Sequence, residues 1–398
     1  SVKTNSALVR KRIRDTRMKV EEYQSGVRSN TTIQILYIED LVHEELLEEV
    51  KNRLEEYKID GILDSGMLEQ LTEDSWFSPF PQYQTTERPD RASKEILNGK
   101  VVLLCDNSPS ALVLPGVFNS FMESSEDWYN RFEMASFLRA LRYVALAAAT
   151  LLPGLYLAVI RFHTQILPTN MILSFAQARE GVPFSSIAEL VLLELSFELI
   201  REAGVRIPGA LGNAMGIVGG LIVGSAAVEA NLVSPIVVMV VAITALGSLA
   251  IPNEEFASAF RLLKYFFLFL GGYLGIFGIV IGVYLTVSHL AGLLSFGVPY
   301  LVPFVKYKRE NGTGTGILRV PFRKRWKRPM YAKEDESVRL RRTRSAKEEE
   351  GQNESEEGSG NWAKEKLRKN EVEETHNSGS QKDPKERSKV GKNGGESE

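Results

Sequence analysis

The chain has 398 residues, with 48 Lys and Arg against 50 Asp and Glu, so its net charge is -2. Its one cysteine, Cys105, excludes an internal disulfide and fits a reducing compartment. The average composition is typical of a soluble protein, but residues 143–305 are largely apolar and charged residues are dense on both sides. A uniform soluble fold is therefore excluded.

Three zones follow from this distribution, and the length suits two or three domains. We predict a multi-domain fold: a small α/β soluble domain at 1–138, an all-α polytopic membrane domain at 139–305 and a disordered tail at 306–398. The chain begins at Ser1 without an apolar leader. We therefore expect no signal peptide and a piece of a longer protein.

The head, residues 1–138, mixes strand and helix patterns. Residues 31–38 are rich in β-branched side chains and predict a buried strand, and 100–106 and 110–116 predict two more. Apolar positions at helical spacing predict helices at 43–57 and 61–74. The alternation favours an α/β or α+β domain.

Known catalytic and metal-binding sequence motifs do not appear in the head. The sequence holds no P-loop, GxSxG, HExxH or CxxC pattern, so we expect no enzyme and assign no catalytic, cofactor or metal residues. Asp106 and Asn107 follow a strand, and a turn between strands is the simpler interpretation. The Pro-rich, aromatic segment 77–93 predicts an extended surface loop.

The apolar block predicts about four spanning helices, because a span needs about 20 apolar residues. They are placed at 143–160, 207–228, 231–252 and 265–287. The apolar segment 289–305 contains two prolines, which favours a separate interfacial or re-entrant course.

Basic residues flank the block on both sides. Arg139 and Arg142 precede it, and Lys306, Lys308 and Arg309 follow it. By the positive-inside rule both flanks lie in the cytoplasm, so the number of spans should be even.

A helix predicted at 185–202 carries charges inside the apolar block. Glu194, Glu198 and Arg201 share one helical face, and Glu189 points nearly opposite. A charge facing lipid costs about 3 kcal/mol or more at the bilayer centre. One interpretation is an interfacial helix with Glu198 paired to Arg201. The other is a carboxylate lining or gate of a cation conduit in an oligomer.

Glycines recur at four-residue spacing in the next helix, at Gly212, Gly216, Gly220 and Gly224. Small residues at this spacing let helix backbones approach closely. Packing within the chain is one interpretation, and a subunit interface or pore wall is the other.

The tail is basic at first and then of mixed charge. The cluster at 319–344 follows the last span, and we expect it to bind anionic lipid rather than nucleic acid. From Lys347 onward almost no apolar residues occur, so disorder is predicted.

Long stretches resemble the A subunits of the GerA-type spore germinant receptors of endospore-forming bacteria. They include "DGILDSGMLEQLTED", "LPTNMILSFAQAREGVPFSSIAELVLLELSFELIREAGVRIPGALGNAMGIVGGLIVG" and "ANLVSPIVVMVVAITALGSLAIPN". The resemblance implies a subunit of the inner spore membrane with a further N-terminal subdomain. It also implies a transporter-like B subunit and a lipoprotein C subunit as partners, and an A subunit that oligomerises into an ion conduit opened by nutrients.

Other classes stay open at this point. A secondary transporter would show an inverted repeat, which is not visible between the halves of the apolar block. A membrane enzyme would need clustered His, Asp or Cys residues at membrane depth. Only His163 and His289 lie near that depth, and they stand in unrelated parts of the sequence. A related subunit of the dipicolinate-release machinery is the remaining alternative. We favour a channel-forming, signalling receptor subunit.

Overall fold

The structure is a computed structural model. It describes residues 1–205, 210–305, 316–324, 327–329, 332–333 and 338. The disorder predicted from Lys347 onward lies outside these residues.

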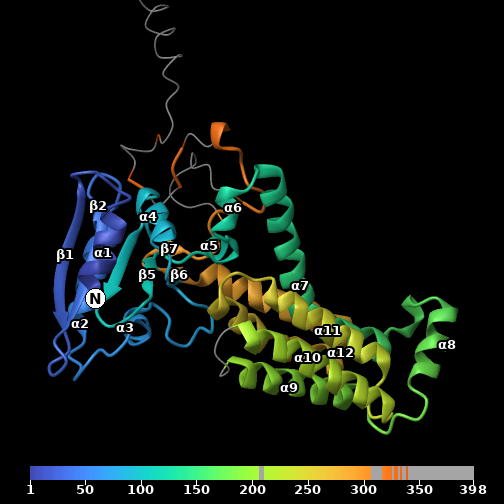
Figure 1. The fold of residues 1–398 in the computed structure, drawn as a ribbon. Coiled ribbons are helices and arrows are strands. Elements are labelled where there is room, and N and C mark those ends of the chain that lie inside the picture. Colours follow the sequence, from blue (N-terminus) through green and yellow to red (C-terminus); the bar gives the residue numbers. More distant parts are fainter. Residues whose placement is uncertain (206–209, 306–315, 325–326, 330–331, 334–337, 339–398) are drawn as a thin grey trace, which may run out of the picture. The chain divides into compact units, whose positions relative to one another are not determined.

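The head is built on a five-stranded antiparallel sheet with strand order β1-β2-β4-β5-β3 (Figure 1). The strands are β1 (Met18–Ser25), β2 (Thr31–Ile38), β3 (Gln84–Thr86), β4 (Val101–Cys105) and β5 (Ala111–Leu114). The three strands predicted from the sequence correspond to β2, β4 and β5. β1 was not predicted because it lies at an edge of the sheet, where only Met18 is buried and its other residues are polar or partly exposed.

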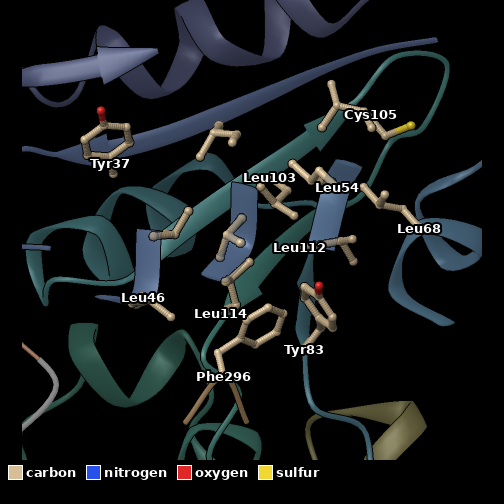
Figure 2. Packing of buried hydrophobic residues seen from close by; sticks show 14 of the residues in the cluster. Tyr37, Leu46, Leu54, Leu68, Tyr83, Leu103, Cys105, Leu112, Leu114 and Phe296 are labelled. Atoms are coloured by element: carbon tan, nitrogen blue, oxygen red, sulfur yellow. The ribbon is translucent and has the colours of Figure 1, made fainter. Parts of the chain in front are cut away.

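Helices cover both faces of this sheet. α2 (Glu44–Glu56) and α3 (Ser65–Thr72) share a buried cluster with one set of strand side chains, including Leu103 and Leu112 (Figure 2). α1 (Val2–Arg10) and α4 (Pro89–Leu97) share a second cluster with the alternate residues, including Val102 and Leu104. β4 is apolar at every position and β2 is apolar from Ile35 to Ile38, because both of their faces are buried.

The segment 77–93, predicted to be an extended loop, is partly regular. It contains β3 and the beginning of α4. The prediction was wrong there because β3 is short and its strand character comes from pairing with β5 rather than from its own residues.

The helical part follows the head in the chain. Its helices are α5 (Phe118–Met122), α6 (Glu126–Tyr129), α7 (Phe132–Phe162), α8 (Thr169–Ala178), α9 (Ser186–Val205), α10 (Ala210–Glu229), α11 (Pro235–Leu249) and α12 (Glu254–Gly292). Single turns of 3-10 helix lie at η1 (Thr164–Ile166) and η2 (Phe322–Lys324). Among the described helices, α7 and α12 are long and apolar enough to cross a membrane, and α11 is a shorter apolar helix.

α12 is two helical segments that fold back on each other. Gly275 interrupts the helix with φ 65° and ψ -148°. A Cβ atom on Gly278 would lie 2.4 Å from the carbonyl oxygen of Leu270, and one on Gly282 would lie 2.7 Å from the ring of Phe267. In a straight helix residues 270 and 278 would stand about 12 Å apart. The single helix predicted at 265–287 is therefore wrong, and the chain reverses at Gly275.

This reversal brings both ends of α12 to the head. Phe256 near its beginning and Leu290 near its end share one buried cluster with Phe118 and Phe121 of α5. The hinge glycine, Gly275, lies instead against Phe162 at the far end of α7. The helical part thus has a head end and a far end, and α8 follows the far end of α7.

After α12 the chain returns to the head core. A short hairpin of β6 (Leu294–Ser295) and β7 (Val298–Pro299) carries Phe296, which packs beside Tyr83 (Figure 2). The ring of Phe296 lies 5.2 Å from that of Tyr83 and 4.4 Å from the guanidinium of Arg53. Part of the segment predicted as interfacial or re-entrant thus packs on the protein, with Phe296 in the head core, while Leu294 and Phe304 remain exposed.

Candidate functional site: buried charges among the apolar helices

The charged side chains of helix α9 bind residues of α11 and α12. Glu194 is buried, and its Oε2 lies 2.5 Å from Nζ of Lys264 on α12. The hydroxyl of Thr244 on α11 donates to the other carboxylate oxygen at 3.3 Å. One buried ion pair therefore ties three helices together.

Sequence reasoning missed Lys264. It directly precedes the apolar run that begins at residue 265. A lysine at the border of such a run needs a compensating partner when it is buried, and that requirement could have pointed to a carboxylate on another helix.

Glu189 lies nearer the far end and is also buried. Its carboxylate accepts from Nη2 of Arg179 at 3.0 Å and from the backbone N–H of Ser234 at 3.0 Å. Ser234 caps the N-terminus of α11, where the helix dipole favours a negative charge. Glu189 thus joins the segment after α8 to the beginning of α11.

Glu198 and Arg201 occupy the head end of α9. Glu198 lies 3.5 Å from Nε of Arg261, which also binds Glu254 at 3.1 Å. Arg201 donates to the hydroxyl of Ser248 at 2.7 Å. In the described structure Arg201 and Glu198 thus have different partners, and the predicted pair between them is not formed.

Solvent access separates the three carboxylates. The side chains of Glu189 and Glu194 are 0% and 2% exposed, whereas that of Glu198 is 39% exposed. A buried carboxylate with a full set of partners holds helices together, and one with free surface can also meet a mobile cation. Of these three carboxylates, that of Glu198 alone combines an ion-pair partner with a surface open to solvent.

The glycine ridge of α10 contacts neighbouring helices of the same chain. A Cβ atom on Gly220 would lie 2.7 Å from the ring of Phe197 on α9, and one on Gly224 would lie 3.2 Å from Val238 on α11. The side-chain surroundings of Gly212 and Gly216 lie outside the described residues. The described half of the ridge lets α10 approach its own bundle.

A second group of charges joins the head to α7. The buried guanidinium of Arg139 lies 3.4 Å from Glu123 and 3.5 Å from the buried Asp127. Arg142 donates to both oxygens of Asp127 at 2.7 and 2.9 Å. Burial alone would raise the pKa of Glu123, but Lys94 and Arg139 lower it to about 2. Lys94 of α4 also binds Glu123, at 2.8 Å, so Arg139, predicted to mark a membrane flank, is linked through Glu123 to the head.

The basic tail segment contacts the head where it is described. Arg319 donates to the carbonyl oxygen of Asn130 at 2.7 Å, and Arg328 donates to that of Leu97 at 2.5 Å. Lys333 donates its backbone N–H to Leu41 at 2.9 Å. Part of the positive charge predicted to bind lipid thus lies on the protein itself.

Together these features define a class: a folded head joined by buried ion pairs to apolar helices, two of which are able to cross a membrane. The chain belongs to the Bacillus/Clostridium GerA spore germination protein family, whose sequence model matches residues 1–331. The resemblance seen in the sequence is confirmed by this match.

Three of the curated relatives come from Bacillus subtilis (strain 168). The chain is 41% identical to the uncharacterized membrane protein YfkQ over 78% of its own length and 61% of the relative's. It is 38% identical to spore germination protein KA over 85% and 62% of the two lengths. For spore germination protein A1 the values are 39%, 81% and 67%. The chain thus spans about three fifths of the first two relatives.

A solved structure is similar to part of the chain. It is the N-terminal domain of the A subunit of the Bacillus megaterium spore germinant receptor GerK3. The identity is 35%, covering 30% of this chain and 94% of that one, with a TM-score of 0.25.

Proposed function

We propose that this chain is the membrane subunit of a spore germinant receptor and couples nutrient sensing to germination. Membership of the GerA family and relatives named as spore germination proteins support this role. Its partners are then the transporter-like B subunit and the lipoprotein C subunit of the receptor. The nutrient itself is recognised elsewhere in the complex.

The proposed place is the inner spore membrane, crossed several times, with head and tail in the cytoplasm. The reversal at Gly275 supports this, because it returns both ends of α12 to the head end. The lipid-binding role of the basic tail is part of the same proposal, through those basic residues that do not contact the head.

The finer proposal is an oligomeric cation conduit whose lining or gate includes Glu189, Glu194, Glu198 and Arg201. The observation that carries it is the carboxylate of Glu198, whose side chain is 39% exposed although it pairs with Arg261, whereas Glu189 and Glu194 are buried in their pairs. In the described arrangement Glu189 and Glu194 are neutralised within the chain, which suits a closed state. The ridge of Gly212, Gly216, Gly220 and Gly224 is proposed as the close-packing wall of the conduit, in which Gly220 and Gly224 pack against α9 and α11 of the same chain.

Substitution of either of two glutamates that bind the same arginine tests the conduit proposal. Glu198 and Glu254 both bind Arg261, but Glu254 stands at the beginning of α12 with its side chain 78% exposed. The complete receptor would be expressed in spores with Glu198→Gln or, as the matched control, Glu254→Gln. We expect the first variant to release cations several-fold more slowly after nutrient addition and the control to behave as the parent.

Protein abundance in the spore membrane must be equal for the comparison to hold. Equal release rates for Glu198→Gln and the parent, at equal abundance, would remove Glu198 from the conduit. A slow control would show instead that the ion pair with Arg261, and not the carboxylate on α9, limits the response.

A further inference from the structure

The loop between α3 and β3, residues 73–83, presents two aromatic side chains to the outside. Trp76 is 81% exposed and Phe77 is 82% exposed, and their rings lie 5.7 Å apart in an edge-to-face arrangement. Large aromatic surfaces are usually buried unless a partner covers them. Their full exposure side by side needs an explanation that the receptor role does not supply.

The chain on both sides of this pair is fixed. Asp74 accepts from the backbone N–H of Phe296 at 2.6 Å and binds Arg53. The hydroxyl of Ser78 lies 2.9 Å from Nε2 of His289, three residues before α12 ends. The aromatic pair is therefore held at the head end of α12 and is not a freely moving loop.

Phe80 strengthens the same attachment. Its ring is buried, 5.3 Å from Phe260 of α12 and 6.3 Å from Tyr300. The loop thus enters the cluster that closes the head end of the helices, while Trp76 and Phe77 remain outside it.

An apolar surface runs along the second segment of α12 toward this loop. Its exposed side chains are Phe277, Val280, Val283, Tyr284, Leu285 and Val287. Val287 is two positions before His289, so the apolar surface ends beside the residue that holds the loop. If α12 crosses the membrane as proposed, the edge of the hydrocarbon layer lies at this level.

We propose that Trp76 and Phe77 insert into the interfacial layer of the bilayer on the head side, where lipid covers them. Aromatic side chains concentrate at this layer because the ring is apolar and the indole N–H still reaches water or headgroups. The loop then fixes the depth of the head against the leaflet, with Ser78 and His289 as its protein attachment. This inference rests on the proposed membrane location.

Fluorescence quenching tests the proposal on the full chain. The protein would be reconstituted in phosphatidylglycerol–phosphatidylcholine vesicles that contain lipid brominated near the headgroup, near the chain end, or not at all. The signal of Trp76 is the difference between the parent and Trp76→Phe, which leaves the other tryptophans in place. We expect shallow bromine to remove at least half of this signal, deep bromine to remove less, and aqueous iodide to have little effect.

A second site supplies the control. Val27 is 74% exposed in the turn between β1 and β2, so Val27→Trp should respond to iodide and not to brominated lipid. Quenching of Trp76 by iodide alone would overturn the proposal. Quenching by neither agent would also overturn it and would indicate cover by a second protein copy.

Flotation of the vesicles separates this proposal from the membrane location itself. A chain that floats with the vesicles after alkaline washing but keeps Trp76 unquenched contradicts only the loop proposal. A chain released by the wash contradicts the membrane location on which the loop proposal depends.

Discussion

Glu194 and Lys264 show how a charge can be kept inside an apolar bundle. Each is costly to bury alone, and together they satisfy one another and a hydroxyl of a third helix. The pair stabilises the bundle only while both members are present. Substitution of one member should therefore destabilise the bundle, and substitution of both should restore most of the lost stability.

Lys264→Met should destabilise the helical part by about 3–5 kcal/mol, because it leaves the carboxylate of Glu194 buried without its cation. Adding Glu194→Leu should restore most of the loss. Thermal unfolding of the purified protein in detergent, together with its yield, measures both. Glu198→Gln is the control and should change stability little, since Glu198 keeps access to water. A single Lys264→Met variant as stable as the parent would contradict the pairing.

Glu69 gives the head a pH dependence. Burial, with smaller contributions from Glu255 and Glu73, raises the pKa of Glu69 from 4.5 to about 8. The folded head then keeps a proton that the unfolded chain loses, so stability should fall as pH rises from about 4.5 to about 8. Glu69→Gln should flatten this fall in the unfolding temperature measured between pH 5 and pH 8.

The matched variant for this measurement is Glu45→Gln, on the exposed face of α2. It should keep the parent's pH dependence. A parent protein whose unfolding temperature stays constant across the same pH range would show that Glu69 is ionised in the folded head.

Among the elements, α12 departs most from its sequence pattern. Its residues have helical character almost throughout, so periodicity predicts a single long helix. The reversal depends on one residue with a positive φ, which glycine adopts without strain and other residues do not. Several glycines nearby allow the two segments to lie close together, and nothing in their spacing says which one turns the chain.

Gly275→Ala should therefore destabilise the protein by about 1–3 kcal/mol, because its φ and ψ belong to a region used almost only by glycine. Phe162 and His163 also lie within 3.1–3.3 Å of the added methyl group. Unfolding temperature and yield in detergent measure the loss. Gly292→Ala, which meets nothing within 4 Å and has no positive φ, should be neutral. Equal behaviour of the two variants would place the turn elsewhere.

At the scale of the whole molecule, the reversal of α12 determines which parts of the chain lie at the same end of the helices. The head lies at one end of the helices and α8 follows the opposite end of α7. If the helices cross the membrane, the head and α8 must be on different sides of it.

Single cysteines test this arrangement in intact cells. A membrane-impermeant maleimide should label Ser174→Cys on α8 without permeabilisation, and Val27→Cys in the head only after it. The parent protein is the blank because its own Cys105 is buried. Labelling of Val27→Cys from outside intact cells would reverse the orientation, and equal labelling of both sites would contradict the spanning arrangement.

Local patterns in the sequence were enough for features that depend on neighbours in the chain. The apolar runs of β2 and β4, the amphipathic α2 and the charged helix α9 are all visible there, because burial on a given face imposes a residue period. The long stretches quoted from the sequence were likewise enough to identify the family. The edge strands β1 and β3 were missed because their residues show only a weak pattern of this kind.

The tertiary structure decided which distant residues meet. Glu194 pairs with Lys264, 70 residues later in the chain, and Ser78 contacts His289, 211 residues later. Phe296 is buried in a head core whose other residues lie far upstream in the sequence. Burying a charge or an aromatic ring creates a demand for a partner but does not specify where in the chain that partner stands. The sequence therefore determined that the carboxylates of α9 needed compensation, and only the tertiary packing of α9 determined that Arg179, Lys264 and Arg261 supply it.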